Sequence, residues 1–145
     1  MAGEQVYPAT RYGPSPLVDL QSRPVRERLS PSALKAFFNI VNRWKVPDEV
    51  SRELLGGVSN GTFYNFKSNP NRVLGADALW RVSYLVGIFK ALNILYSEAL
   101  ADGWMQRPNS NSIFAGKTPL GYVRIGGIPA LQTVRRLLDA RRGGL

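Results

Sequence analysis

The chain has 145 residues, of which 44% are hydrophobic and 10% aromatic, and it carries a formal net charge of +9 with a pI near 10.4. That is enough apolar material for one packed domain, or for two small ones that share a core. Cysteine and histidine are both absent, which excludes a disulfide framework, a cysteine nucleophile, a Cys/His zinc site and a histidine general base. A strongly basic small protein favours nucleic acid, anionic ligands or acidic proteins as partners.

The remaining residue types do not indicate an enzyme. Neither paired carboxylates nor a Ser–Lys constellation stands at a spacing that a helix would bring into one pocket, so we expect a binding protein without a cofactor. Residues 1–16 contain no apolar core, so we expect no signal peptide. The most apolar stretch, residues 79–100, is interrupted by Arg81, Lys90 and Glu98 and predicts a buried helix, not a membrane span. We therefore expect a cytoplasmic protein.

The first segment is rich in proline. Residues 1–28 hold four prolines and show no helical period, which predicts an extended arm. Helix signals begin at Ser30, which can cap a helix, and at Pro31, which fits the first helical position. Apolar residues then recur at helical spacing and predict an amphipathic helix: Leu34, Phe37, Phe38, Val41 and Trp44.

Two short helices follow, joined by a glycine turn. The first begins near Pro47 and ends at the pair Gly56-Gly57, because glycine tolerates the left-handed conformation at a helix end. The second begins at a Ser59 cap and runs to Lys67. The pair Asn60-Gly61 would also suit a hairpin turn, but the flanking residues do not alternate as strands do. The pattern predicts a helix-turn-helix.

The second of these helices has a polar outer face. Asparagine, threonine and lysine side chains can bind base edges or phosphates, while Phe63 and Phe66 pack inward. An ordinary helical hairpin with a polar surface explains the same pattern. The candidate DNA-binding residues are Ser59, Asn60, Thr62, Tyr64, Asn65 and Lys67.

The region from residue 76 to 96 predicts a long helix with two adjoining apolar stripes, and residues 97–106 predict a further turn or a separate helix. Leu79, Val82 and Val86 begin one stripe, and Leu85 and Ile88 begin the other. Two stripes bury more than half of a helix circumference. Such a helix belongs either at the centre of a domain or in a subunit interface.

Residues 104–127 mix turn-forming and large apolar residues. Gly116-Lys117-Thr118 suggests a phosphate loop, but that motif needs a glycine at position 111, which is asparagine. A helix start explains the segment better, with Thr118 as cap and a short helix that runs from the next residue to the pair Gly126-Gly127. We expect six residues to form a structural frame for this region: Trp104, Pro108, Asn109, Phe114, Gly116 and Pro119.

The last predicted helix begins at Pro129 and carries a cluster of arginines. Cations near a helix C-terminus stabilise it by a few tenths of a kcal/mol each, which alone explains Arg141 and Arg142. Together with Arg135 and Arg136 they also form a surface that suits carboxylate or phosphate. No segment predicts a strand, so the expected fold is all-α.

A set of elements in fixed order runs through the second half of the chain: LVGIFKAL (85–92), Trp104, Pro108-Asn109, Phe114, Gly116, Thr118-Pro119-Leu120, Gly126-Gly127 and VRRLLDA (134–140). This run resembles the C-terminal toxin-binding domain of the Xre/MbcA/ParS antitoxin family. The upstream segment LLGGVSNGTFYNFKSNP (54–70) resembles the Xre-type helix-turn-helix of that family. The resemblance implies a helix-turn-helix domain over residues 29–75 and a toxin-binding domain over 76–145, and the predicted arm over residues 1–28 is not part of the shared pattern.

The resemblance also implies a function, the antitoxin half of a bacterial type II toxin–antitoxin pair. The toxin in such pairs is typically a RES-domain enzyme that consumes NAD, and the antitoxin covers its active-site entrance. Many members repress their own promoter, and homodimers within larger toxin–antitoxin complexes are usual. The chain departs from the family in the helix that would bind DNA, where Lys67 is the only charged residue between Ser59 and Ser68. A DNA-binding repressor whose C-terminal half only dimerises is therefore the alternative.

An NAD-binding cleft is expected to be locally positive, because it must accept phosphates. A basic antitoxin would then bind acidic surface around the entrance, or place its terminal carboxylate in the phosphate site. The candidate toxin-binding residues are Arg124, Arg135, Arg136, Arg141, Arg142 and Leu145.

Overall fold

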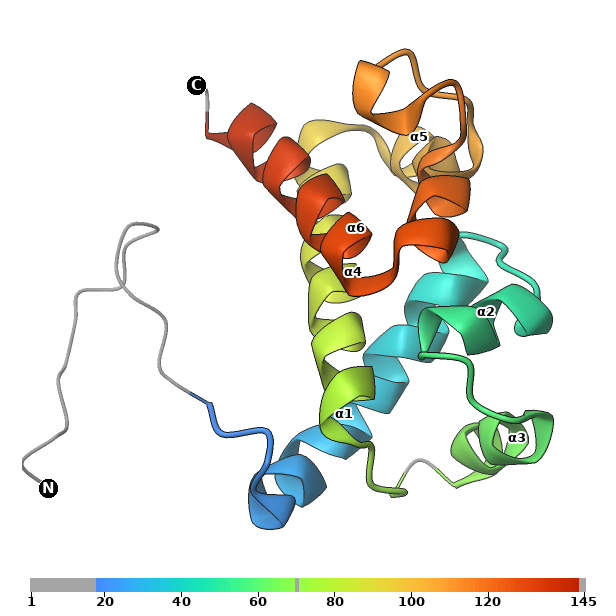
Figure 1. Cartoon of the computed structure of the whole chain (residues 1–145), viewed down its shortest axis with the longest axis vertical. Coiled ribbons are helices and arrows are strands. Elements are labelled where there is room, and N and C mark those ends of the chain that lie inside the picture. Colours follow the sequence, from blue (N-terminus) through green and yellow to red (C-terminus); the bar gives the residue numbers. More distant parts are fainter. Residues whose placement is uncertain (1–17, 70, 144–145) are drawn as a thin grey trace, which may run out of the picture.

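The computed structural model describes residues 18–69 and 71–143, and every regular element within these ranges is helical. The elements are α1 (Arg23–Arg43), α2 (Asp48–Leu54), α3 (Asn60–Ser68), α4 (Ala76–Leu95), α5 (Glu98–Gly103), the 3₁₀ turns η1 (Trp104–Gln106) and η2 (Ser112–Phe114), and α6 (Pro119–Arg142). An N-terminal helix-turn-helix region precedes a helical C-terminal region (Figure 1). The all-α prediction is confirmed.

Helix α4 lies at the centre and packs against α1 and α6 (Figure 1). Leu85, Ile88 and Leu92 are completely buried between them, so the expected position at the centre of a domain is confirmed. In the described part of the chain, α4 is the one helix long and apolar enough to cross a membrane. Its contacts with α1 and α6 bury part of this apolar surface, while Trp80 and Ile94 stay exposed.

The start of α1 differs from the prediction. The helix begins at Arg23 and has Pro24 in its first turn, so Pro31 lies inside it. Residues 23–28 are therefore helical, and the prediction of an arm through residue 28 is wrong for them; residues 1–17 of that arm lie outside the described residues. Proline in a helix interior costs about 3 kcal/mol, which is offset here by the buried face that begins with Leu34 and Phe37.

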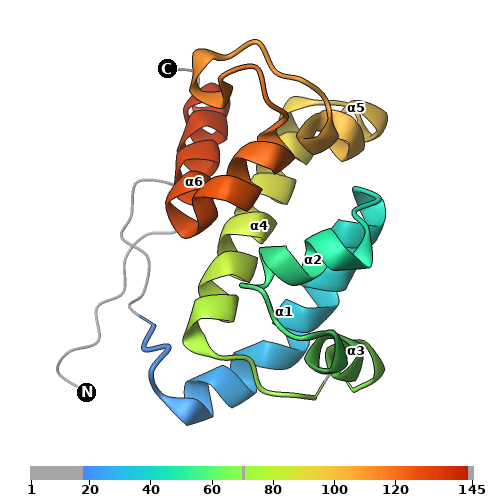
Figure 2. The same ribbon diagram turned by 45° about the vertical axis from the view of Figure 1, so that its right-hand side comes forward.

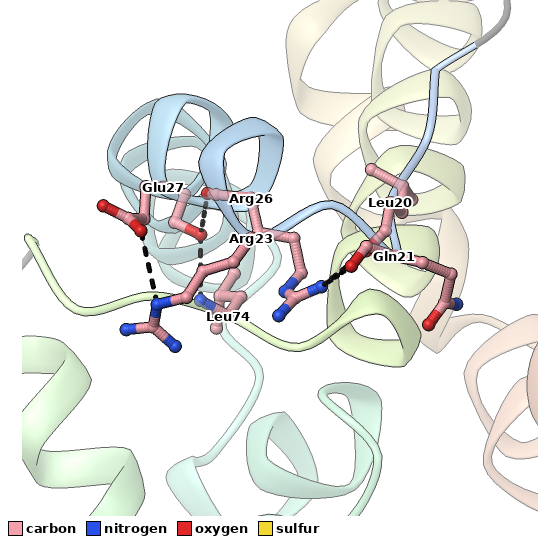
Figure 3. Close-up of polar contacts among 7 residues, drawn as sticks. Leu20, Gln21, Arg23, Arg26, Glu27 and Leu74 are labelled. Carbon is pink, nitrogen blue, oxygen red and sulfur yellow. Dashed lines mark hydrogen bonds and ion pairs between the residues drawn. The ribbon is translucent and has the colours of Figure 1, made fainter.

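Polar contacts fix the first turns of α1 (Figure 3). The Arg26 guanidinium donates to the Leu20 carbonyl at 2.9 Å, and Arg23 pairs with Glu27 at 3.2 Å. Ser30, expected as an N-cap, is instead fully buried within the helix. Its hydroxyl donates to the Arg26 carbonyl at 2.6 Å and accepts the Leu74 N–H at 2.8 Å. Ser30 thus joins α1 to the segment before α4.

The helix-turn-helix has the predicted boundaries. Helix α2 starts after Pro47. Gly56 and Gly57, which follow its end, have φ values of 101° and 81°, which L-residues with side chains rarely adopt. Ser59 caps α3 by accepting the Thr62 N–H at 3.2 Å. The preference for a helix over a hairpin at Asn60-Gly61 is confirmed.

The second half of the chain also starts its helices as predicted. The Thr118 hydroxyl accepts the Gly121 N–H at 3.0 Å, so Thr118 caps α6 directly before Pro119. Gly127 has φ 62° and ψ −143°, a non-helical conformation that kinks α6. The predicted break at Gly126-Gly127 is this kink, and it turns the arginine-bearing end of α6 away from the first turns (Figure 2).

The expected frame residues lie around one aromatic contact. Phe114 is fully buried and meets Trp104 and Tyr122 edge to face, at ring-centroid distances of 6.0 and 5.3 Å. Pro119 is buried beside them. The Asn109 side chain accepts the Asn111 N–H at 2.9 Å and shapes the connecting turn, whereas Pro108 is exposed. Gly116 has a φ of 82°. The framing role of the six residues as a set stays a prediction.

We predict that Ser30→Ala lowers the free energy of unfolding by about 1–3 kcal/mol, because it leaves the Leu74 N–H buried without an acceptor. Equilibrium urea unfolding followed by circular dichroism measures the change. The matched control is Ser32→Ala, an exposed serine on the same helix, for which we expect a change within about 0.5 kcal/mol. Equal effects of the two substitutions would contradict the bridging role of Ser30.

Candidate functional site

The outer face of α3 presents fewer free polar groups than its sequence suggests. Ser59 and Thr62 are occupied by the cap, and their hydroxyl oxygens lie 2.9 Å apart. Asn60 and Asn65 are exposed, and Tyr64 has an exposed fraction of 51%. Asn60, Tyr64 and Asn65 are therefore the side chains best placed to bind a nucleic acid.

Lys67, the charged residue of α3, already has a partner. Its ammonium lies 2.9 Å from the Asp48 carboxylate on α2 and 5.3 Å from the centre of the Phe63 ring. The ion pair joins the two helices of the helix-turn-helix and neutralises the lysine. The face therefore has little positive charge of its own with which to attract phosphates.

Arg124 binds the helix-turn-helix. Its guanidinium forms a two-pronged ion pair with Glu53 of α2, at 2.6 and 3.2 Å. The hydrogen bond from Arg124 lowers the pKa of Glu53 and correspondingly raises the pKa of Arg124, and the attraction between the charges adds to both shifts. Of the candidate toxin-binding residues, Arg124 is thus held against α2 on the far side of the α6 kink from the others.

Asp139 engages two of the remaining arginines. Arg135 lies 2.9 Å from its carboxylate, and Arg142 lies 3.8 Å from it. The Arg135 guanidinium also rests on the backbone of α4 at Gly87, where a Cβ atom would clash with it. Arg135 therefore holds α6 close to α4, and its exposure is intermediate.

Arg136 and Arg141 are the candidate toxin-binding residues that have no carboxylate partner among the described residues. Arg136 is exposed and forms no ion pair with any residue in the described ranges. Arg141 is exposed and donates to the Tyr96 hydroxyl at 3.2 Å. Leu145 lies outside the described residues. The structure thus brings Arg135, Arg136, Arg141 and Arg142 together on the end of α6 and separates Arg124 from them.

Arg107 is not among the toxin-binding residues predicted from the sequence. It lines the same surface pocket as Arg141. The signal for it was weak, a single arginine ahead of the Pro108-Asn109 turn with no acidic residue near it in the sequence. A second, apolar hollow lies at the α6 kink, where Ile125 has an exposed fraction of 75%. Neither feature has a period that a sequence pattern could reveal.

Two family models match adjacent parts of the chain. Residues 21–87 match the antitoxin Xre-like helix-turn-helix domain, and residues 91–144 match the antitoxin Xre/MbcA/ParS C-terminal toxin-binding domain. An uncharacterized protein of Sinorhizobium fredii, y4oB, is 38% identical over 115 residues, which cover 79% of this chain and 87% of y4oB. The chain belongs to the Xre/MbcA/ParS antitoxin family. No solved structure matches it.

The two halves of this antitoxin share α4. The helix-turn-helix match includes α1, α2, α3 and most of α4, and the toxin-binding match begins in the last turns of α4. The division expected at residue 76 stays a prediction. Since α4 packs on both α1 and α6, it joins the helix-turn-helix to the toxin-binding domain.

We predict that Arg124→Ala raises the pKa of the Glu53 carboxyl back toward its ordinary value near 4.5. Because the folded-state pKa of Glu53 is lowered, the pair adds stability above the unfolded-state pKa, and this stability is lost as the pH falls through the folded-state value. The pair is partly exposed, so its coupling energy is about 1 kcal/mol or less. Carbon-detected NMR titration of Glu53 measures the pKa directly.

Arg136→Ala is the matched control for this titration. It removes the same charge from α6 at a residue without an ion pair to Glu53. An equal rise in the Glu53 pKa in both variants would show a general charge effect and contradict the specific pairing.

Proposed function

We propose that this antitoxin neutralises a RES-type, NAD-consuming toxin by covering the entrance of its active site. The observation that carries the proposal is the match of residues 91–144 to a toxin-binding domain, whose last helix ends in exposed arginines. In the cytoplasm the two proteins would form a type II toxin–antitoxin pair. Acidic residues around a phosphate-accepting cleft would be the natural partners of these arginines.

The arrangement of the helices supports simultaneous binding of toxin and DNA. The end of α6 lies at the opposite end of the molecule from α3 (Figures 1 and 2). A toxin bound at the C-terminal end of α6 would leave the outer face of α3 open. Repression of the antitoxin's own operon, by the antitoxin alone or in complex with the toxin, is therefore part of the proposal, as is a homodimer that would match a two-fold symmetric operator.

The arginines differ in how readily each could bind a toxin carboxylate, because some already have an internal ion pair. Arg136 and Arg141 are exposed and form no ion pair with a carboxylate in the described ranges, so a toxin carboxylate can pair with them without breaking an internal ion pair. Arg142 shares Asp139 at a longer distance. Arg124 would first have to leave Glu53, which reduces the net gain from any toxin contact.

The alternative function is transcriptional repression without toxin neutralisation. The exposed Asn60 and Asn65 on α3 favour it, because an asparagine can form two hydrogen bonds to an adenine edge in the major groove. The neutralised Lys67 weighs against strong, non-specific DNA binding.

The proposal predicts that co-expression with the adjacent toxin gene restores growth and intracellular NAD, and that the two proteins co-purify. A truncation after Ala140 removes Arg141, Arg142 and residues 143–145 and moves the terminal carboxylate to Ala140, and we expect it to weaken neutralisation. Growth rescue and NAD concentration at matched expression levels measure the effect. Full-length protein carrying Lys90→Ala, an exposed charge on α4, is the control for lost charge. Undiminished rescue by the truncated protein would exclude a role for the C-terminal end.

Repression makes a separate prediction. Asn60→Ala and Asn65→Ala should each weaken operator binding by about 1–3 kcal/mol and relax base preference at one position. The double variant Asp48→Asn/Lys67→Ala, which removes both charges of the ion pair, should leave the salt dependence of binding unchanged. Fluorescence anisotropy with the promoter fragment and a scrambled fragment, across a salt series, measures both. Equal affinity for the two fragments would contradict operator recognition.

A further inference from the structure

A surface pocket of about 350 Å³ lies where the end of α4, the α5–η1 segment and the last turns of α6 meet. Two arginines line it, Arg107 and Arg141, together with the Tyr96 hydroxyl and the polar side chains of Asn109 and Ser110. No acidic residue is among its lining residues, all of which lie in the described part of the chain. The pocket is therefore rich in hydrogen-bond donors and positive charge, and no internal carboxylate balances it.

The guanidinium of Arg107 is held in position although no carboxylate in the described part of the chain binds it. One of its terminal nitrogens donates to the Leu100 carbonyl at 2.7 Å. Another lies so close to Gly103 that a Cβ atom there would fall 2.6 Å from it. These two contacts restrict the exposed side chain, and its remaining N–H donors have no carboxylate partner among the described residues. A fixed guanidinium loses little conformational entropy when it binds a carboxylate.

Arg141 is held in a similar way. It donates to the Tyr96 hydroxyl at 3.2 Å, and among the described residues it has no ion pair, unlike Arg135 and Arg142, which share Asp139. The chain thus pairs two of the arginines at the end of α6 internally and directs a third into the pocket. Charges that a fold leaves unpaired but positioned are suited to a partner of opposite sign.

We propose that this pocket binds an acidic side chain of the toxin, with Arg107 and Arg141 as the two guanidinium donors. This proposal rests on the proposed function and adds that the toxin contributes an aspartate or a glutamate to the contact. Apolar surface in the pocket favours a protein segment over a free anion. Leu100 has an exposed fraction of 52%, and Trp104 lies beside it, so the methylene groups next to an aspartate or glutamate carboxylate would have apolar contacts.

The position of the pocket separates it from any DNA on α3. The ends of α4 and α6 and the α5–η1 segment lie together at one end of the molecule, and α3 lies at the other (Figure 1). All of the lining residues fall within residues 91–144, the toxin-binding match. A toxin carboxylate is thus the anion that this location favours.

The test compares the full-length double variant Arg107→Ala/Arg141→Ala with wild type in titration calorimetry against the toxin encoded beside this gene. Loss of charge-assisted hydrogen bonds should weaken binding roughly tenfold to a hundredfold for each arginine. The double variant Lys35→Ala/Lys90→Ala removes two exposed charges elsewhere and should bind as wild type does. Thermal unfolding of every variant checks that the fold is retained.

Two further variants identify the interaction. Arg107→Lys/Arg141→Lys keeps the charge and loses the planar fork, so we expect an affinity between those of the alanine variant and wild type. In the charge-reversed variant Arg107→Glu, changing one acidic toxin residue to lysine should recover binding, which also names the partner residue. If no single reversal on the toxin recovers binding, the proposed carboxylate contact is wrong.

The outcomes separate the pocket from the function. Toxin binding by wild type and equally by the alanine variant overturns the pocket while the proposed function stands. Absence of toxin binding by wild type overturns both. NMR titration of the free antitoxin with inorganic phosphate tests whether the pocket binds a free anion. Phosphate binding that depends on Arg107 and Arg141, with unchanged toxin affinity in the alanine variant, would assign the pocket to a free anion and overturn the proposal.

Discussion

Helix α4 is buried between α1 and α6, and the positions of the other helices depend on that burial. Leu85, Ile88 and Leu92 lose all contact with water there, and burial of each such side chain contributes about 1.5–3 kcal/mol. Because one face of α4 completes the core of the helix-turn-helix and another completes the toxin-binding domain, neither half has a separate core. The outer face of α3 and the C-terminal end of α6, the two proposed binding surfaces, are consequently held at a fixed separation.

Charged contacts between the halves supplement this shared core. Arg43 at the end of α1 pairs with Asp102 at 3.0 Å and with Glu98 at 2.9 Å, and so ties α1 to α5. Arg124 of α6 pairs with Glu53 of α2. The second contact holds the first turns of α6 against α2, the helix that precedes α3. Both contacts add to the shared core in fixing the helix-turn-helix relative to the C-terminal region.

Local sequence rules located most helix starts, and distant contacts explain the failures. Ser59 and Thr118 cap helices through bonds to residues three positions away, so their roles were predictable. Ser30 has the same local features, but its hydroxyl accepts an N–H from a residue 44 positions away. The local sequence around a serine does not distinguish an N-cap from a buried hydrogen bond to a distant residue such as Leu74. The arm prediction failed at Arg23 for this reason, since the helix start had been placed at Ser30.

The same limit applies to the arginines of the candidate site. Sequence predicts where they gather, because four of them fall within the last helix turns, but it does not distinguish those with internal partners. Arg124 meets a glutamate 71 positions earlier, whereas Arg107 has neighbours that fix it and no carboxylate among the described residues. A net charge of +9 gives general attraction to any acidic surface, which raises the association rate. Selectivity for one toxin needs positioned charges without an internal carboxylate partner, and in the described part of this chain Arg107 and Arg141 are a pair of that kind.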